Sequence, residues 1–181
     1  MENKKVLILL SLIILLGLFL RIYKIGEESF WIDEAATVYT AQQSPSDTIK
    51  DIYTTTKQAP QYYEGGGSPP FYFLIANYWT KLVGLSEAKL RLLSAIFGTI
   101  SIFMIFAIGR MLFGYKVGLI SAFILAINFM HINYSQEARG YSLVILLTLF
   151  TVYFLINGLD GKKNTYWLGY SIAGALLVYT H

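Results

Sequence analysis

An acidic pair near the start of the chain, Asp33 and Glu34, is the strongest candidate for chemistry. The pair follows Trp31 and comes shortly after an apolar segment long enough to cross a bilayer. Ionisable groups beside hydrocarbon are costly, so they usually mark a ligand path, a proton relay or a catalytic site. One carboxylate could deprotonate an acceptor hydroxyl while its neighbour tunes its pKa or holds a divalent cation. The alternative is that both carboxylates only favour the N-terminus of a helix.

A second polar segment, residues 131–141, is wedged between two apolar runs. It carries Arg139 close to the start of a predicted helix, where a guanidinium could grip a phosphate with two hydrogen bonds. We therefore predict that Arg139 binds a lipid headgroup phosphate or a lipid-linked phosphate, with Tyr134, Gln136 and Glu137 in support. The alternative is an ordinary polar turn between two membrane spans.

Two further candidates stand alone. His181 follows Tyr179 and Thr180 at the end of an apolar run, where a histidine either supports a substrate or simply hydrogen-bonds at the interface. Ser68 precedes two prolines and is either part of the site or a turn signal. The chain has no cysteine, which excludes disulfides and thiolate chemistry.

The composition indicates an integral membrane protein. Hydrophobic residues make up 55% of the chain and charged residues only 14%, with a mean hydropathy of +0.53. The net charge of +3 is small and scattered, so nucleic acid is not expected as a partner. Runs that approach the roughly 20 residues needed to cross a bilayer predict spans over about 6–23, 92–113, 117–130 and 141–156, with a fifth over 167–179.

The basic residues predict which side of the membrane each connection occupies. Short flanking segments rich in lysine and arginine favour the cytoplasm. With these five spans, one side receives three basic pairs: Lys4 and Lys5, Arg110 and Lys116, and Lys162 and Lys163. The N-terminus is then cytoplasmic, and the loop 24–91, the turn 131–139 and His181 are extracytoplasmic. All the candidate residues therefore meet at one membrane face.

The loop 24–91 is expected to carry short interfacial helices. One is predicted over 32–43, and a second over 48–53 with Ser46 and Asp47 as its cap. Residues 54–67 show no periodicity and read as an irregular loop. Pro69 and Pro70 favour the start of a helix over 71–85, which is too short for a comfortable span.

The order of the motifs resembles the dolichyl-phosphate-mannose protein mannosyltransferase-like membrane glycosyltransferases. This resemblance implies a GT-C fold, an all-α transmembrane bundle with a large first extracytoplasmic loop, and a polyprenyl-phosphate sugar as donor. Family members generally continue through more spans, and the chain closes at His181 without a polar tail, so we expect an N-terminal portion. The motifs are Trp31 to Ala35, Pro69 to Tyr72, Leu90 to Gly98, Tyr134 to Arg139, and Tyr179 to His181.

The resemblance also implies roles for single residues. Asp33 would be the general base with Glu34 beside it, and Arg139, with or without a metal ion, would stabilise the departing lipid phosphate. His181 could support either substrate. The family often has His-Pro-Pro where this chain has Ser68-Pro69-Pro70, so that histidine's role is open or falls to His131 or His181.

The expected reaction is transfer of a sugar to an acceptor hydroxyl by a single, inverting displacement. The acceptor could be protein, lipid or glycan, and the donor lipid dolichyl or undecaprenyl phosphate. The residues indicate no definite cofactor, and a divalent cation could assist. The alternative is a non-catalytic membrane protein or partner subunit that binds a lipid-phosphate headgroup.

Overall fold

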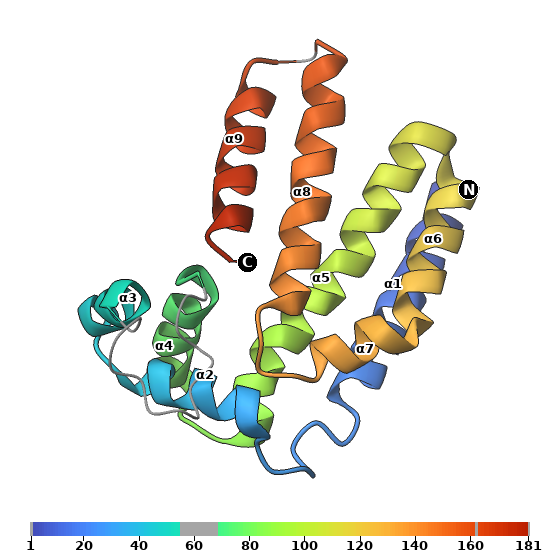
Figure 1. Ribbon diagram of the computed structural model, residues 1–181. Helices are drawn as coiled ribbons and strands as arrows, with labels where there is room; N and C mark the ends of the chain where they lie inside the picture. The colour runs from blue at the N-terminus through green and yellow to red at the C-terminus, as the bar shows by residue number, and fades with distance from the viewer. Residues whose placement is uncertain (1, 55–68, 162, 181) are drawn as a thin grey trace.

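The computed structural model describes residues 2–54, 69–161 and 163–180, and in these ranges every regular element is an α-helix (Figure 1). The predicted all-α membrane bundle is confirmed. The helices are α1 (Glu2–Ile22), α2 (Ile32–Gln42), α3 (Pro45–Thr54), α4 (Phe71–Val83), α5 (Glu87–Phe113), α6 (Tyr115–Ile127), α7 (Phe129–Ser135), α8 (Tyr141–Leu159) and α9 (Thr165–Val178).

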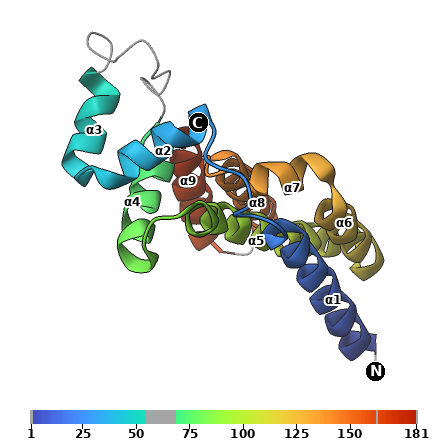
Figure 2. The same cartoon turned by 90° about the horizontal axis from the view of Figure 1, so that it is seen from below.

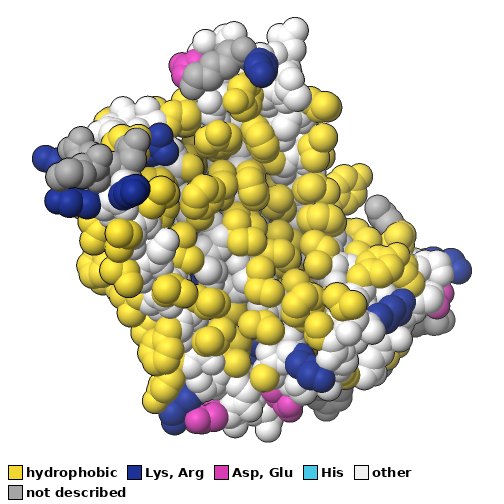
Figure 3. Space-filling view, turned by 180° about the vertical axis from the view of Figure 1, so that it is seen from behind, with side chains coloured by type: hydrophobic (Ala, Val, Ile, Leu, Met, Phe, Trp, Pro, Cys, Tyr) yellow, Lys and Arg dark blue, Asp and Glu magenta, His cyan; other side chains and the backbone are white. Residues whose placement is uncertain are grey.

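Three of the described helices, α1, α5 and α8, are long and apolar enough to cross a membrane. Helices α6 and α7 pass the same test together but are bent by 61° at their junction, and α9 is apolar with only 14 residues. Hydrophobic side chains cover the middle of the face shown in Figure 3, and charged side chains gather around its edges. The protein is therefore membrane-integral, with three or four spans among the described residues.

The segment predicted as a span over 117–130 is not one continuous helix, because α6 ends before Asn128 and α7 begins after it. The Asn128 side chain accepts a hydrogen bond from the His131 N–H at 2.9 Å and so caps a new helix, α7. On the other side of the break, the buried Arg21 guanidinium donates to the Leu125 and Ala126 carbonyls, each at 3.1 Å. Two carbonyls at the bend are thus satisfied inside the protein, as the membrane interior requires.

The bundle has two distinct ends. The N-terminus and the α5–α6 and α8–α9 connections lie at one end, and α2, α4 and α7 lie toward the other (Figure 1). Seen from below, α1 packs beside α6 on one side of α5, and α4 groups with α2 and α3 on the other side (Figure 2). The basic connections and the polar candidate segments are therefore separated along the bundle, and which end faces the cytoplasm stays a prediction.

The loop 24–91 carries the short helices that the sequence predicts. Helix α2 ends within a residue of the prediction. Helix α3 begins earlier than predicted, because the Ser44 hydroxyl accepts a hydrogen bond from the Asp47 N–H at 3.2 Å. Helix α4 starts directly after Pro70, and its Phe71 N–H donates to the Tyr179 carbonyl at 2.9 Å. Its buried face, including Tyr72, packs into the protein, so α4 is more than a surface helix. Ser68, most of the predicted irregular loop and His181 fall outside the described residues.

Gly98 on α5 allows α5, α7 and Arg21 to approach closely. A Cβ at Gly98 would overlap the Ser135 side chain and lie 3.0 Å from Arg21 Nε. We expect Gly98→Ala to lower the free energy of unfolding by about 1–3 kcal/mol, since overpacking forces its neighbours apart.

At Gly174, in the middle of α9, a Cβ would meet nothing within 4 Å, and Gly174→Ala should raise the free energy of unfolding by about 0.5–1 kcal/mol. Unfolding in detergent checks both, and equal losses would contradict the packing argument.

Candidate active site

A buried ion pair lies at the centre of the site. The Arg91 guanidinium meets the Glu34 carboxylate with two hydrogen bonds, Nε to Oε1 at 2.8 Å and Nη2 to Oε2 at 2.6 Å. Glu34 is fully buried and Arg91 is 6% exposed. The remaining N–H groups of Arg91 donate to the carbonyls of Ile25, Glu28 and Ser29. Because every donor of the guanidinium has a partner, the pair can be buried without an uncompensated group.

Glu34 also holds the loop before α8 against α2. Its Oε1 accepts the Ala138 N–H at 2.7 Å, and the next residue, Arg139, donates from Nη1 to the Asp33 carbonyl at 3.2 Å. Residues more than a hundred positions apart in the chain are thereby fixed next to each other. The structure therefore brings together Asp33, Glu34 and Arg139.

A second contact fixes the backbone of Arg139 from the other side. Ser94 Oγ donates to the Arg139 carbonyl at 3.1 Å and accepts from the Tyr72 hydroxyl, 2.9 Å away. Tyr72 is 1% exposed, and this burial raises its pKa, so the phenol stays a neutral donor. Helices α4 and α5 thus position the residue that is predicted to bind phosphate.

The two members of the acidic pair have different surroundings. The Glu34 carboxylate accepts hydrogen bonds from Arg91 and from the Ala138 N–H, and a longer one from the Trp31 N–H at 3.4 Å. The Asp33 carboxylate is partly exposed and accepts no hydrogen bond from the described residues. Asp33 is therefore the member of the pair that an incoming hydroxyl could reach.

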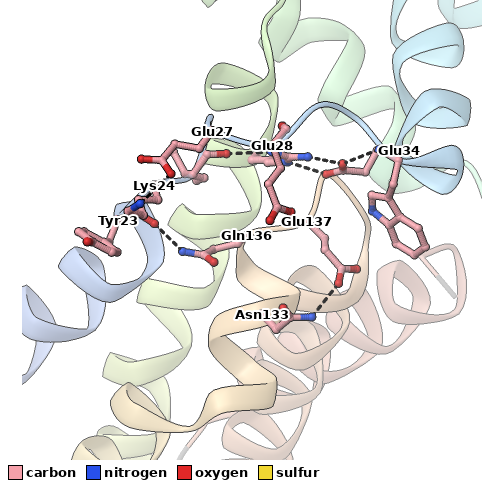
Figure 4. Close-up of a pocket in the computed structure, with 11 residues that line it drawn as sticks. Tyr23, Lys24, Glu27, Glu28, Glu34, Asn133, Gln136 and Glu137 are labelled. Atoms are coloured by element: carbon pink, nitrogen blue, oxygen red, sulfur yellow. Dashed lines mark hydrogen bonds and ion pairs between the residues drawn. The ribbon is translucent and has the colours of Figure 1, made fainter.

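A cavity of about 630 Å³ lies beside the ion pair (Figure 4). Its wall comes from the segment after α1, the starts of α2 and α5, and the segment from α7 to the loop before α8. Glu137 faces this space, and its Oε1 accepts from Asn133 Nδ2 at 2.9 Å. The predicted supporting residue Glu137 is thus a cavity residue next to the Asp33–Arg139 contact.

Glu137 gives the site a pH-dependent stability. Burial, and then the nearby charge of Glu34, raise the pKa of Glu137. The folded chain then binds the Glu137 proton more tightly than the unfolded chain does. This proton stabilises the folded state at pH values below the ordinary pKa of a glutamate, and the stabilisation is lost as the pH rises through the raised pKa of Glu137. We expect Glu137→Gln to increase stability by less than about 1 kcal/mol at pH ~8 and to have no effect at pH ~4, measured by thermal unfolding. A variant that lost stability at pH ~8 would contradict this assignment.

The other predicted supporting residues have structural contacts. Gln136 Nε2 donates to the Leu20 and Tyr23 carbonyls at 3.1 and 3.0 Å and so closes the end of α1. The Tyr134 ring packs on Tyr141 with centroids 4.9 Å apart. In the part of the chain that the structure describes, no three His, Asp or Glu residues could hold a metal ion together. The divalent cation therefore stays a prediction.

Roles for Arg91, Tyr72 and Ser94 do not follow from the sequence analysis above. One signal was available for Arg91, since it stands within the apolar run Leu90 to Gly98 and a charged residue in such a run needs a partner. Tyr72 and Ser94 carry no comparable signal, because a tyrosine and a serine occur freely in membrane helices.

One comparison with known proteins identifies a family. A family model described as dolichyl-phosphate-mannose-protein mannosyltransferase matches residues 67–181, more than half of the chain. A search of curated proteins and a search of solved structures gave no match. The matched part includes Arg91, Glu137 and Arg139, whereas Asp33 and Glu34 precede it. The ion pair and the Arg139 contact therefore join the matched helices to α2, and the chain belongs to the dolichyl-phosphate-mannose-protein mannosyltransferase family.

Proposed function

We propose that the chain transfers a sugar from a polyprenyl-phosphate donor to an acceptor hydroxyl, at the extracytoplasmic membrane face. The observation that carries this proposal is the contact between Arg139 and the backbone of Asp33. It sets a fixed positive charge next to a carboxylate that the described residues leave open. A glycosyl transfer from a lipid phosphate needs both groups, one for the acceptor proton and one for the leaving phosphate.

Asp33 acts as the general base. A neutral hydroxyl is a poor nucleophile, and a positioned carboxylate that takes its proton contributes about 10² to 10⁴ in rate. The acceptor oxygen then attacks the anomeric carbon from the face opposite the phosphate, and the bond to the phosphate oxygen breaks. This single displacement inverts the anomeric centre, and the proton remains on Asp33.

Arg139 stabilises the phosphate as it leaves. One N–H of its guanidinium is used on the Asp33 carbonyl, and the others can meet phosphate oxygens. Arg139 also precedes the N-terminus of α8, whose dipole favours an anion. In a cleft of low dielectric, such charge contacts strengthen as the negative charge develops. We retain His181 as a second proposed group for the donor.

Glu34 has a different role from the one that the sequence implied. We propose that it is a positioning residue, because its carboxylate is buried and bonded to Arg91 and to Ala138. It holds α2 and the loop before α8 in register, and in this way sets Asp33 against Arg139.

The experiment is transfer of radiolabelled sugar from a panel of polyprenyl-phosphate donors, in membranes that contain the chain. We expect transfer from at least one such donor, none from nucleotide sugars, and at least a tenfold loss in Arg139→Gln, since one charge-assisted contact is worth about 1.5–3 kcal/mol. Arg110→Gln is the matched control, because Arg110 is in the last turn of α5, at the opposite end of the bundle. Equal loss in both variants would argue against a phosphate contact at Arg139, and transfer from nucleotide sugars alone would refute the donor class.

A further inference from the structure

We propose that the cavity beside α2 is the acceptor subsite and that it selects a hydroxyl-rich ligand bearing an ammonium group, the chemistry of an amino sugar. The assignment of the cavity as an acceptor subsite rests on the proposed function. The preference for a cation rests on the cavity itself, and it can be tested without any transfer reaction.

The cavity has the size of a ligand site and an excess of negative charge. Its volume of about 630 Å³ lies within the usual range for small-molecule sites. Four carboxylates and two cationic side chains line it. Two of the carboxylates are neutralised within the wall, Glu34 by Arg91 at 2.6 Å and Glu27 by Lys24 at 2.9 Å. Glu28 and Glu137 form no ion pair with the described residues, so the cavity keeps a negative potential.

These two carboxylates stand on fixed backbone. The Glu28 carbonyl accepts from Arg91 Nη1 at 2.8 Å, so the buried guanidinium holds the chain at this residue. Glu137 is held by Asn133, and its neighbour Ala138 is bonded to Glu34. In Figure 4 the Glu28 carboxylate points toward the part of the cavity that Glu137 lines, whereas the Glu27 carboxylate points away. A wall held in this way does not have to reorganise when a ligand binds.

The spacing of the acidic groups suits an organic cation better than a metal ion. Among the described residues no three His, Asp or Glu side chains are close enough to share a metal. The same cavity includes Trp31, which is 46% exposed and has no described cation over its ring. An indole face attracts an ammonium group and also offers a flat apolar surface for a sugar ring.

The cavity lies beside the proposed reacting groups. Trp31 precedes Asp33 by two positions at the start of α2, and Glu137 precedes Arg139 by two positions before α8. The charges of Asp33 and Arg139 both act on Glu137. Asp33 and Arg139 do not line the cavity themselves, but Glu137 does. A ligand at the Glu137 side of the cavity therefore lies near the proposed base and phosphate contact.

Binding can be measured by quenching of tryptophan fluorescence in the purified chain, in detergent and without donor. The probes are glucosamine, N-acetylglucosamine and glucuronate, which share a pyranose ring and carry positive, zero and negative charge. We expect glucosamine to bind most tightly and glucuronate most weakly. Trp31→Phe should remove the quenching, and Glu28→Gln should weaken glucosamine binding about three- to fivefold, the size of one partly exposed charge contact.

Glu27→Gln is the matched control, because Glu27 lines the same cavity but is paired with Lys24. It should change glucosamine binding less than Glu28→Gln does, and each variant should lose less than about 1 kcal/mol of unfolding free energy. Binding of glucuronate or N-acetylglucosamine as tight as that of glucosamine, no quenching by any probe, or a Glu27→Gln effect equal to that of Glu28→Gln would each overturn the proposal. The binding measurement contains no donor, so a failure of the sugar-transfer experiment does not change its outcome. A failure of glucosamine binding likewise does not change the outcome of the sugar-transfer experiment.

Discussion

Glu34→Gln is expected to lower the free energy of unfolding by about 3–5 kcal/mol, because it leaves the buried Arg91 charge without its counterion. Gln has nearly the shape of Glu, so packing is kept while the charge is lost. The amide nitrogen of the new glutamine would also face N–H groups that now donate to the carboxylate, from Arg91 at 2.6–2.8 Å and from Ala138 at 2.7 Å. A buried donor facing another donor adds the cost of an unsatisfied group.

The matched comparison is Glu27→Gln, which makes the same chemical change in an exposed pair. Lys24 and Glu27 are joined at 2.9 Å, but their side chains are 55% and 59% exposed. Such a pair contributes less than about 1 kcal/mol, because water and salt screen it. Equilibrium unfolding in detergent gives both values. Losses of similar size would show that the Arg91–Glu34 pair is not what holds α2 to the bundle.

The second large effect is expected at Asp33. Asp33→Asn should reduce sugar transfer by about 10² to 10⁴ while the unfolding temperature stays at the wild-type value. The activity falls because an amide cannot take the acceptor proton. The fold is kept because the Asp33 carboxylate bonds to none of the described residues, and its structural contact is made through the backbone carbonyl to Arg139.

Asp47→Asn makes the same substitution on the neighbouring helix α3 and should leave both transfer and stability close to wild type. Asp47 is exposed, and its ion pair with Lys50 is long, at 3.9 Å. Its carboxylate also accepts from the Ser44 hydroxyl at 2.6 Å, and the side-chain oxygen of an asparagine can accept the same hydrogen bond. Initial rates from a saturating lipid-phosphate donor and thermal unfolding of the same preparations test the pair of variants. Full activity in Asp33→Asn would show that Asp33 is not the general base, and Glu137 would be the next carboxylate to replace.

The sequence determined the membrane class, the helical architecture and the candidate motifs. Apolar runs and turn residues are local signals, so they predicted α1, α5, α8 and the short helices of the first loop with small errors at their ends. The bend after α6 was not predicted, because one asparagine within an apolar run does not by itself end a membrane span. The break depends on a cap at Asn128 and on Arg21 from a distant helix.

Only the tertiary structure separated the two members of the acidic pair. Asp33 and Glu34 are neighbours with similar chemistry, and no local rule tells which carboxylate will be buried. The difference comes from partners that lie 57 and 104 positions away from Glu34, namely Arg91 and Ala138. Adjacent residues on a helix point in directions about 100° apart, so packing against one side buries one carboxylate and leaves the other open. The sequence therefore located the candidate carboxylates, and the packing of α2 on α5 and on the loop before α8 decided which of them is open.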